Sequence, residues 1–198
     1  MKSISCLFML TALVLFSGCA GVPLKVGSQR IVEKSAIQQP EWLQVPFYEK
    51  KEMMYFSGTV KGVGDYAVGL RQAKAEAMKN VAESIQTKAR TEFIENTRGV
   101  NLSTEDLGRF VQDGIAMVAD NINISGLFPI EYYYEKVEEI TESGVRYFFN
   151  CSALLKLPES DYKTGRKMAI KGLASKARKQ LDKDAELAAV KLLEKLED

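Results

Sequence analysis

The residues most suggestive of chemistry are the glycines in YFSGTVKGVGDYAVGL, residues 55–70. Gly62, Gly64 and Ala67 stand between a short apolar run and a helical pattern, which is half of the G-x-G-x-x-A fingerprint of dinucleotide-binding folds. That fingerprint requires a parallel strand after the helix, ending in an acidic residue about twenty positions on. Here the helical pattern continues past residue 90 and another follows it. We therefore predict that these glycines shape the backbone and that the chain binds no nucleotide cofactor.

The acidic residues of segment 130–140 are a second candidate for chemistry. Acid–base catalysis by paired carboxylates needs environments that separate their pKa values. Glu138 and Glu139 point to opposite faces of a strand, and Glu135 shares a face only with Glu139. The pattern thus favours a solvated, charged strand. The chain also has no histidine, which excludes Ser-His-Asp and Cys-His nucleophiles and the commonest zinc sites. We expect a protein without catalytic residues, metal or cofactor.

Tyr132, Tyr133 and Tyr134 form the third candidate. Consecutive residues of a strand point to opposite faces, so at least one of these rings is expected to be exposed. An exposed tyrosine can stack on a sugar ring or anchor a protein partner. Tyrosine is also a common strand residue, so a purely structural role stays open.

The first eighteen residues have the order of a secretory signal. Lys2 supplies the positive charge, residues 7–16 are apolar, and Ser17 and Gly18 are the small residues that close the segment. The apolar run is too short to span a bilayer stably. Residues 1–18 are therefore predicted to be a cleaved signal peptide.

The end of that signal resembles the lipobox of bacterial lipoproteins, in Phe16-Ser17-Gly18-Cys19. The resemblance implies that Cys19 is modified with diacylglycerol, freed by a signal peptidase and N-acylated with a fatty acid such as palmitate. Two or three acyl chains anchor a protein far more firmly than one. Ala20 follows the cysteine where an Asp would imply retention at the inner membrane. The expected location is the outer membrane, with the periplasmic or surface face left open.

Charge and cysteine content limit the remaining possibilities. Without residues 1–18 the chain carries 26 basic and 26 acidic residues, so no excess of positive charge favours nucleic acid. Cys151 is then the one cysteine that is neither removed nor lipidated, and no disulfide within the chain is expected.

The pattern along the chain places these residues on elements. Residues 19–39 have no sustained periodicity and are predicted to be a flexible tether. Trp42 is expected to fill the core at the edge of the domain. Residues 53–63 alternate like a strand, and the glycines at 58 and 62 on its apolar face would let a helix or backbone pack closely.

A long helix is predicted over residues 66–96, with Asp65 as its N-terminal cap. A second helix is expected over 103–121, followed by strands at 130–140 and 145–157 that flank a hairpin turn. Small and apolar residues recur at helical spacing in the first helix, namely Leu70, Ala73, Ala77, Val81, Ile85 and Ala89.

The last forty residues are charged and helical, and a single helix is predicted over about 160–197. Its apolar stripe consists of Leu173, Ala177, Leu181, Ala185, Ala188, Leu192 and Leu196. This stripe could cover the sheet, pair with a second copy of the chain or contact a partner. In the preceding strand Cys151 shares a face with core residues, so an inert buried thiol is expected.

Several of these segments together resemble a known family. Pro40-Glu41-Trp42, the strand YFSGTVKGVG, the helix AVGLRQAKAEAMKNVAESI and the strand YFFNCSALLKLP are similar to the twenty-kilodalton lipoprotein antigen family of bacterial outer membranes. A related unit is the N-terminal domain of flagellar assembly protein T. The resemblance covers residues 40–158 and implies an α+β domain with a long helix on an antiparallel sheet. It supplies no catalytic residues.

The sequence therefore predicts four regions: a signal peptide at 1–18, a lipidated tether at 19–39, an α+β domain at 40–158 and a helical extension at 159–198. The leading hypothesis is a non-enzymatic outer-membrane lipoprotein that serves as an interaction or assembly module in the envelope, with a flagellar association as its narrower form. Its expected partners are the membrane, other envelope proteins and a second copy of the chain. The alternative is a module that binds peptidoglycan or another glycan.

Overall fold

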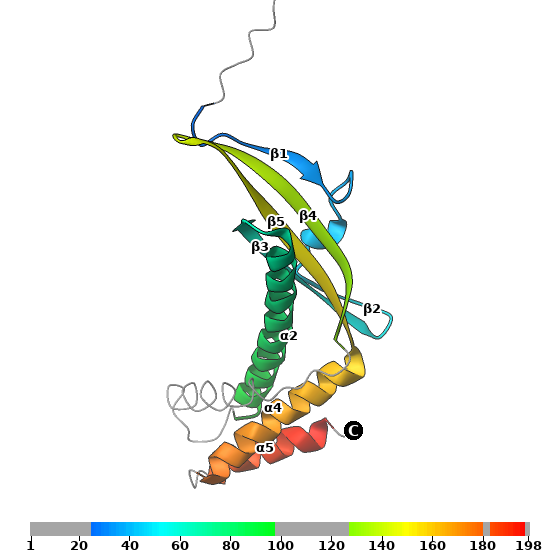
Figure 1. The fold of residues 1–198 in the computed structure, drawn as a ribbon. Helices are drawn as coiled ribbons and strands as arrows, with labels where there is room; N and C mark the ends of the chain where they lie inside the picture. The colour runs from blue at the N-terminus through cyan, green and yellow to red at the C-terminus, as the bar shows by residue number, and fades with distance from the viewer. Residues whose placement is uncertain (1–24, 98–126, 180–182, 197–198) are drawn as a thin grey trace, which may run out of the picture.

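The computed structural model describes residues 25–97, 127–179 and 183–196. A five-stranded antiparallel sheet in the order β1-β4-β5-β3-β2 is packed against helices, which confirms the α+β class (Figure 1). In chain order the elements are β1 (Gln29–Lys34), η1 (Glu41–Leu43), β2 (Phe47–Lys50), β3 (Met53–Val63), α2 (Tyr66–Thr97), β4 (Phe128–Thr141), β5 (Gly144–Pro158), α4 (Glu159–Lys179) and α5 (Lys183–Lys195).

The predicted strands at 130–140 and 145–157 are confirmed as β4 and β5, which form the longest hairpin of the sheet. Its strands pair from Phe128 opposite Lys156 to Thr141 opposite Gly144. Gly144 has a φ of 131°, a conformation that a side chain would strain, and the Thr141 hydroxyl donates to its carbonyl. The predicted turn between the two strands is therefore confirmed.

The predicted tether needs a correction, because residues 29–34 form strand β1. This strand pairs with β4 at the edge of the sheet, from Gln29 opposite Glu139 to Lys34 opposite Glu135. Every residue of β1 is exposed, so no burial pattern marks it in the sequence. Residues 29–34 are held as a strand by backbone pairing with β4, and their side chains give no sign of this in the sequence.

The opposite edge is also a strand that the sequence did not indicate. β2 pairs with β3 through a two-residue loop at Lys51 and Glu52, whose φ angles are 51° and 58°. Positive φ at both loop positions is the geometry of a type I′ turn, which normally favours Asn-Gly. The turn carbonyl of Glu52 accepts a hydrogen bond of 2.9 Å from the N–H of Glu159, so this loop fixes the start of α4.

Helix α2 covers one face of the sheet by crossing β3 and β5 (Figure 1). The predicted cap is confirmed, since the Asp65 carboxylate accepts a hydrogen bond of 2.8 Å from the N–H of Val68. The crossing is closest at Gly58, where an added Cβ would lie 2.2 Å from the backbone nitrogen of Ala77. The predicted stripe is also confirmed, because Ala73, Ala77, Val81, Ile85 and Ala89 are all fully buried.

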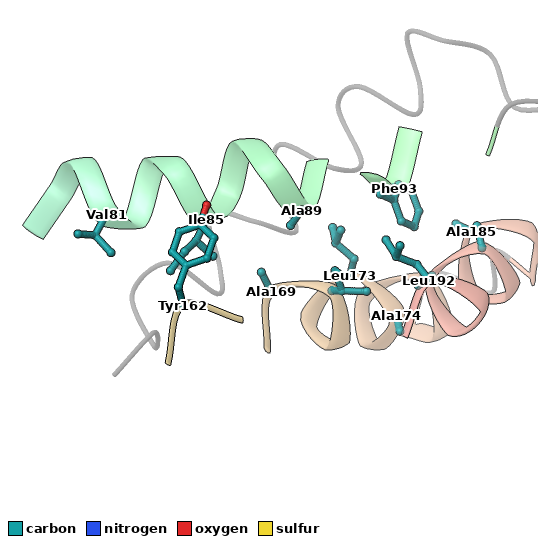
Figure 2. Packing of buried hydrophobic residues seen from close by; sticks show 14 of the residues in the cluster. Val81, Ile85, Ala89, Phe93, Tyr162, Ala169, Leu173, Ala174, Ala185 and Leu192 are labelled. Atoms are coloured by element: carbon teal, nitrogen blue, oxygen red, sulfur yellow. The ribbon is translucent and has the colours of Figure 1, made fainter. Parts of the chain in front are cut away.

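The C-terminal region forms two helices, where the sequence indicated one. α4 and α5 pack side by side and against the C-terminal half of α2 (Figures 1 and 2). Ile85 and Phe93 of α2 meet Leu173 of α4 and Leu192 of α5 in one buried cluster. The described residues of the stripe that could have paired with a second copy thus pack within the chain, and Leu181 lies outside the described residues.

Some sequence predictions fall on residues outside the described ranges. These are the signal peptide at 1–18, the lipidation site Cys19 and the helix at 103–121. Among the described residues, no helix is both long and apolar enough to cross a membrane.

Candidate functional site

A groove lies beneath the edge strand β2. It lies between β2, the middle of α2 and the start of α4, and its volume is about 600 Å³. The groove lies at the sheet edge because α2 crosses β3 and β5, which are the first and second strands in from the edge strand β2 that carries Phe47. Its mixed lining consists of Phe47, Glu49, Met54, Asn80, Glu83, Ser84, Thr87, Lys88, Thr91, Glu159, Tyr162, Lys163 and Arg166.

The floor of this groove is apolar and aromatic. Phe47 on the rim lies 4.9 Å from the ring of Phe56, which in turn lies 6.3 Å from Tyr162. Met54 and Phe56 are buried, whereas Phe47 is 39% exposed. An apolar floor with one exposed aromatic ring at its margin is suited to receiving an apolar side chain from a partner.

Polar contacts between α2 and α4 hold the walls of the groove in place. The hydroxyls of Ser84 and Tyr162 are hydrogen bonded at 2.9 Å, and burial raises the pKa of Tyr162. Further along, the guanidinium of Arg166 donates to the carboxylate of Glu92 at 3.2 Å, and both side chains are mostly buried. Lys88 lies 3.9 Å from the same carboxylate. Removing one member of such a buried pair is costly, so these contacts set the spacing of the two helices.

The backbone of β2 adds hydrogen-bonding groups to the groove, because some of its N–H and C=O groups point to the free edge of the sheet. The N–H of Ser57 donates to the carbonyl of Pro46, and hydrogen-bonded pairs alternate along an antiparallel ladder. Tyr48 and Lys50 therefore exchange hydrogen bonds with β3, while the backbone groups of Phe47 and Glu49 point to the free edge. An open strand edge can accept an additional strand from another chain.

The three predicted tyrosines do not form one site, because the sheet divides them. Tyr133 is only 2% exposed and packs with Trp42 and Leu154 on the face opposite α2. Tyr134 lies on the α2 face, 4.7 Å from the ring of Tyr66. Trp42 is buried, as predicted for a core residue at the domain edge.

Of the three, Tyr132 is the exposed one, with 41% of its surface accessible. The hydroxyl of Tyr134 donates to Glu33 at 2.6 Å, and this hydrogen bond raises the pKa of Tyr134. The expectation that at least one ring is exposed is therefore confirmed for Tyr132, whereas the other two rings serve the packing of the sheet.

The prediction of a solvated acidic strand is wrong for Glu138. This residue is only 7% exposed, and its carboxylate accepts hydrogen bonds from Arg30 at 2.7 Å and from Tyr147 at 2.8 Å. The hydrogen bond from Arg30 lowers the pKa of Glu138. Glu139 projects to the other face and pairs with Arg146 and Gln29. The Arg30–Glu138 ion pair and the Gln29–Glu139 hydrogen bond join β1 to β4, whereas Arg146 and Glu139 pair within the β4–β5 hairpin.

Cys151 lies in the core, as its position in the strand indicated. It is fully buried, and burial raises the pKa of its thiol. A Cβ added at Gly69 of α2 would lie 2.6 Å from the Cys151 sulfur, so helix and strand pack closely here too. Within the described ranges no group of three or more potential ligands could hold a metal ion.

Sequence reasoning missed the groove, since neither β2 nor its turn carries a recognisable signal. The one hint was the apolar Phe47 close to the strand that begins at Met53. Comparisons with protein-family models, curated proteins and solved structures find no match to this chain.

Proposed function

We propose that this chain is a non-enzymatic lipoprotein of the bacterial outer membrane that acts as an interaction module in envelope assembly. In this proposal the groove beneath β2 receives an extended segment of another envelope protein. The segment would pair with the free backbone groups of Phe47 and Glu49 and insert an apolar side chain beside Phe47. The observation that carries the proposal is this combination of an open strand edge with an aromatic-floored groove.

The sequence supports the envelope part of the proposal. The signal-like segment 1–18 and the lipobox-like residues ending in Cys19 favour export and lipid anchoring. The similarity of residues 40–158 to outer-membrane lipoprotein antigens points the same way. The absence of histidine from the chain favours binding over nucleophilic catalysis.

The test is photo-crosslinking in living cells with the full chain. A benzophenone amino acid replaces Glu49, which lines the groove, and a matched variant carries it at Lys171, an exposed position of α4 outside the groove. We expect the Glu49 probe alone to crosslink to one segment of one envelope protein, identified by mass spectrometry. Phe47→Asp should abolish this crosslink, because a carboxylate would be placed against the aromatic floor.

Two outcomes would overturn the proposal. Equal crosslinking from Glu49 and Lys171 would show that the groove has no special role. Specific turnover by the purified chain, abolished by a single substitution, would show that the protein is an enzyme. A crosslink that persists unchanged in Cys19→Ser would show that the groove binds its partner without the lipid anchor. The binding role of the groove would then stand, and the anchoring part of the proposal would not be needed for it.

A further inference from the structure

A second hollow, polar in character, opens on the face of the sheet opposite α2. Its volume is about 370 Å³, and its floor spans the three central strands. Tyr133, Ser152 and Thr59 stand in one row across β4, β5 and β3, as the strand register places them opposite one another. Ser152 neighbours Cys151, which faces the helix, so this row points away from α2.

A second row and a wall complete the pocket. Glu135 of β4 and Asn150 of β5 face each other, and Lys61 of β3 lines the pocket beside them. Gln39, which precedes η1, and Leu43, the last residue of η1, form the wall. A solvated sheet face is commonly flat and polar, but this wall makes the polar rows concave.

Hydrogen bonds within the pocket hold its side chains in fixed positions. The Tyr133 hydroxyl donates to one oxygen of Glu135 at 2.9 Å, and the Gln39 amide donates to the same oxygen at 3.4 Å. The Asn150 side-chain oxygen accepts from the N–H of Gly62 at 3.2 Å. Burial and the Glu135 carboxylate raise the pKa of Tyr133 to about 12, so its phenol remains a donor at neutral pH.

The same hydrogen bonds leave a defined set of groups for a ligand. In the part of the chain that the structure describes, the second oxygen of Glu135, the side-chain N–H groups of Asn150 and the ammonium of Lys61 have no partner. One carboxylate acceptor thus stands near an amide donor and a charged donor. A ligand that satisfies all three must offer both donors and acceptors on adjacent atoms, as neighbouring hydroxyl groups do.

We infer that this pocket binds a sugar, with adjacent hydroxyls between Glu135, Asn150 and Lys61. The remaining lining agrees with this ligand class: it is neutral and hydroxyl-rich at Thr59 and Ser152. Leu43 supplies an apolar wall for the less polar face of a sugar ring. The pocket volume lies at the lower end of the range for small-ligand sites.

Saturation-transfer NMR on the full chain in detergent tests the inference. The probes are the disaccharides diacetylchitobiose and cellobiose, together with the dipeptide glycylglycine, a zwitterion that would also match Glu135 and Lys61. We expect saturation transfer to at least one disaccharide. Glu135→Gln and Lys61→Met should each weaken binding by about tenfold, because each removes a hydrogen bond to a charged group. Lys156→Met is the matched control on the same sheet face, and it should bind like the wild type.

The outcomes separate the ligand classes. Absence of transfer to both disaccharides from a chain with native circular dichroism would overturn the inference, as would transfer to glycylglycine alone. Equal weakening by the Lys156 control would also overturn it. A pull-down of the same variants with purified peptidoglycan sacculi identifies the source of the sugar. If sacculi retain the wild type and retain Glu135→Gln and Lys61→Met less, the ligand is wall glycan. If only the disaccharides respond, the ligand is a soluble sugar.

Discussion

The crossing of α2 over β3 makes a sharp prediction for Gly58→Ala. At this point the backbone of the helix and the backbone of the strand touch directly. The new Cβ would lie 2.2 Å from the nitrogen and 2.8 Å from the Cα of Ala77, and 2.4 Å from the carbonyl oxygen of Ala73. All three neighbours are backbone atoms of a helix, so no side-chain rotation can relieve the clash.

The magnitude follows from the displacement that the helix must undergo. Restoring an ordinary contact of 3.4 Å from 2.2 Å requires a separation of about 1.2 Å. A gap of this size forfeits a quarter to a half or more of the dispersion energy between the facing surfaces. Overpacking of a dense core costs about 1 to 3 kcal/mol, and the loss under the alanine stripe adds to it. We expect Gly58→Ala to lower the free energy of unfolding by about 3 kcal/mol or more, a large share of the 5–15 kcal/mol typical of a domain.

Urea unfolding followed by tryptophan fluorescence measures this change. Trp42 is the only tryptophan and is buried on the far face of the sheet, so it reports unfolding without contacting α2. Gly64→Ala is the control, because an added Cβ there has no neighbour within 4 Å. It should alter stability by less than about 1 kcal/mol. A cost for Gly58→Ala below 1 kcal/mol, or one equal to the control, would refute the close helix crossing.

Three further predictions concern the turn, an ion pair and the thiol. Replacing Lys51-Glu52 by Asn-Gly should raise the free energy of unfolding by about 1 to 2 kcal/mol in the same urea assay, because both φ angles are positive; no gain would argue against a type I′ turn. The folded state lowers the pKa of Glu138 through Arg30, so the pair stabilises the fold above the ordinary carboxyl value of 4.5 and this stability is lost as the pH falls through the lowered pKa. Glu138→Gln should flatten that acid-induced decrease, and an unchanged pH profile would contradict the assignment. In a Cys6→Ser, Cys19→Ser chain, iodoacetamide should label Cys151 in urea and leave it unlabelled in native buffer, as mass spectrometry would show; rapid native labelling would mean that the thiol is accessible.

The long elements could be predicted from the sequence because their patterns are local. α2 buries a residue at every fourth position from Ala73 to Phe93, and β3 and β5 are runs of eleven and fifteen residues rich in apolar and aromatic strand formers. The edge strands could not be predicted in this way. β1 buries no side chain, and β2 has four residues and a turn without Asn or Gly. β1 and β2 are strands because their backbones pair with β4 and β3, and backbone pairing leaves no periodic pattern of side chains in the sequence.

The candidate sites depended even more on distant contacts. Strand alternation correctly separates Tyr133 from its two neighbours, but only the packing of α2 and η1 decides which face is covered. Glu138 is buried because Arg30, 108 residues earlier in the chain, lies across the β1–β4 pair. The break between α4 and α5 was equally hidden, because the apolar spacing continues from Leu173 to Leu192 across the two helices. No local pattern marks the end of α4 at Lys179.

The position of β1 would also give a lipid-anchored chain a direction relative to the membrane. The N–H of Gly27 donates to the carbonyl of Ile140, so the chain enters the fold at the tip of the β4–β5 hairpin (Figure 1). If Cys19 carries the proposed lipid, the six residues to Lys25 can span at most about 20 Å, and this tip must stay close to the bilayer. α2, with 32 residues, is roughly 48 Å long and extends from the sheet to the α4–α5 pair. The long axis of such a lipoprotein would point away from the membrane. The α4–α5 pair and the β2 groove would then lie at a fixed distance from the bilayer, facing away from it.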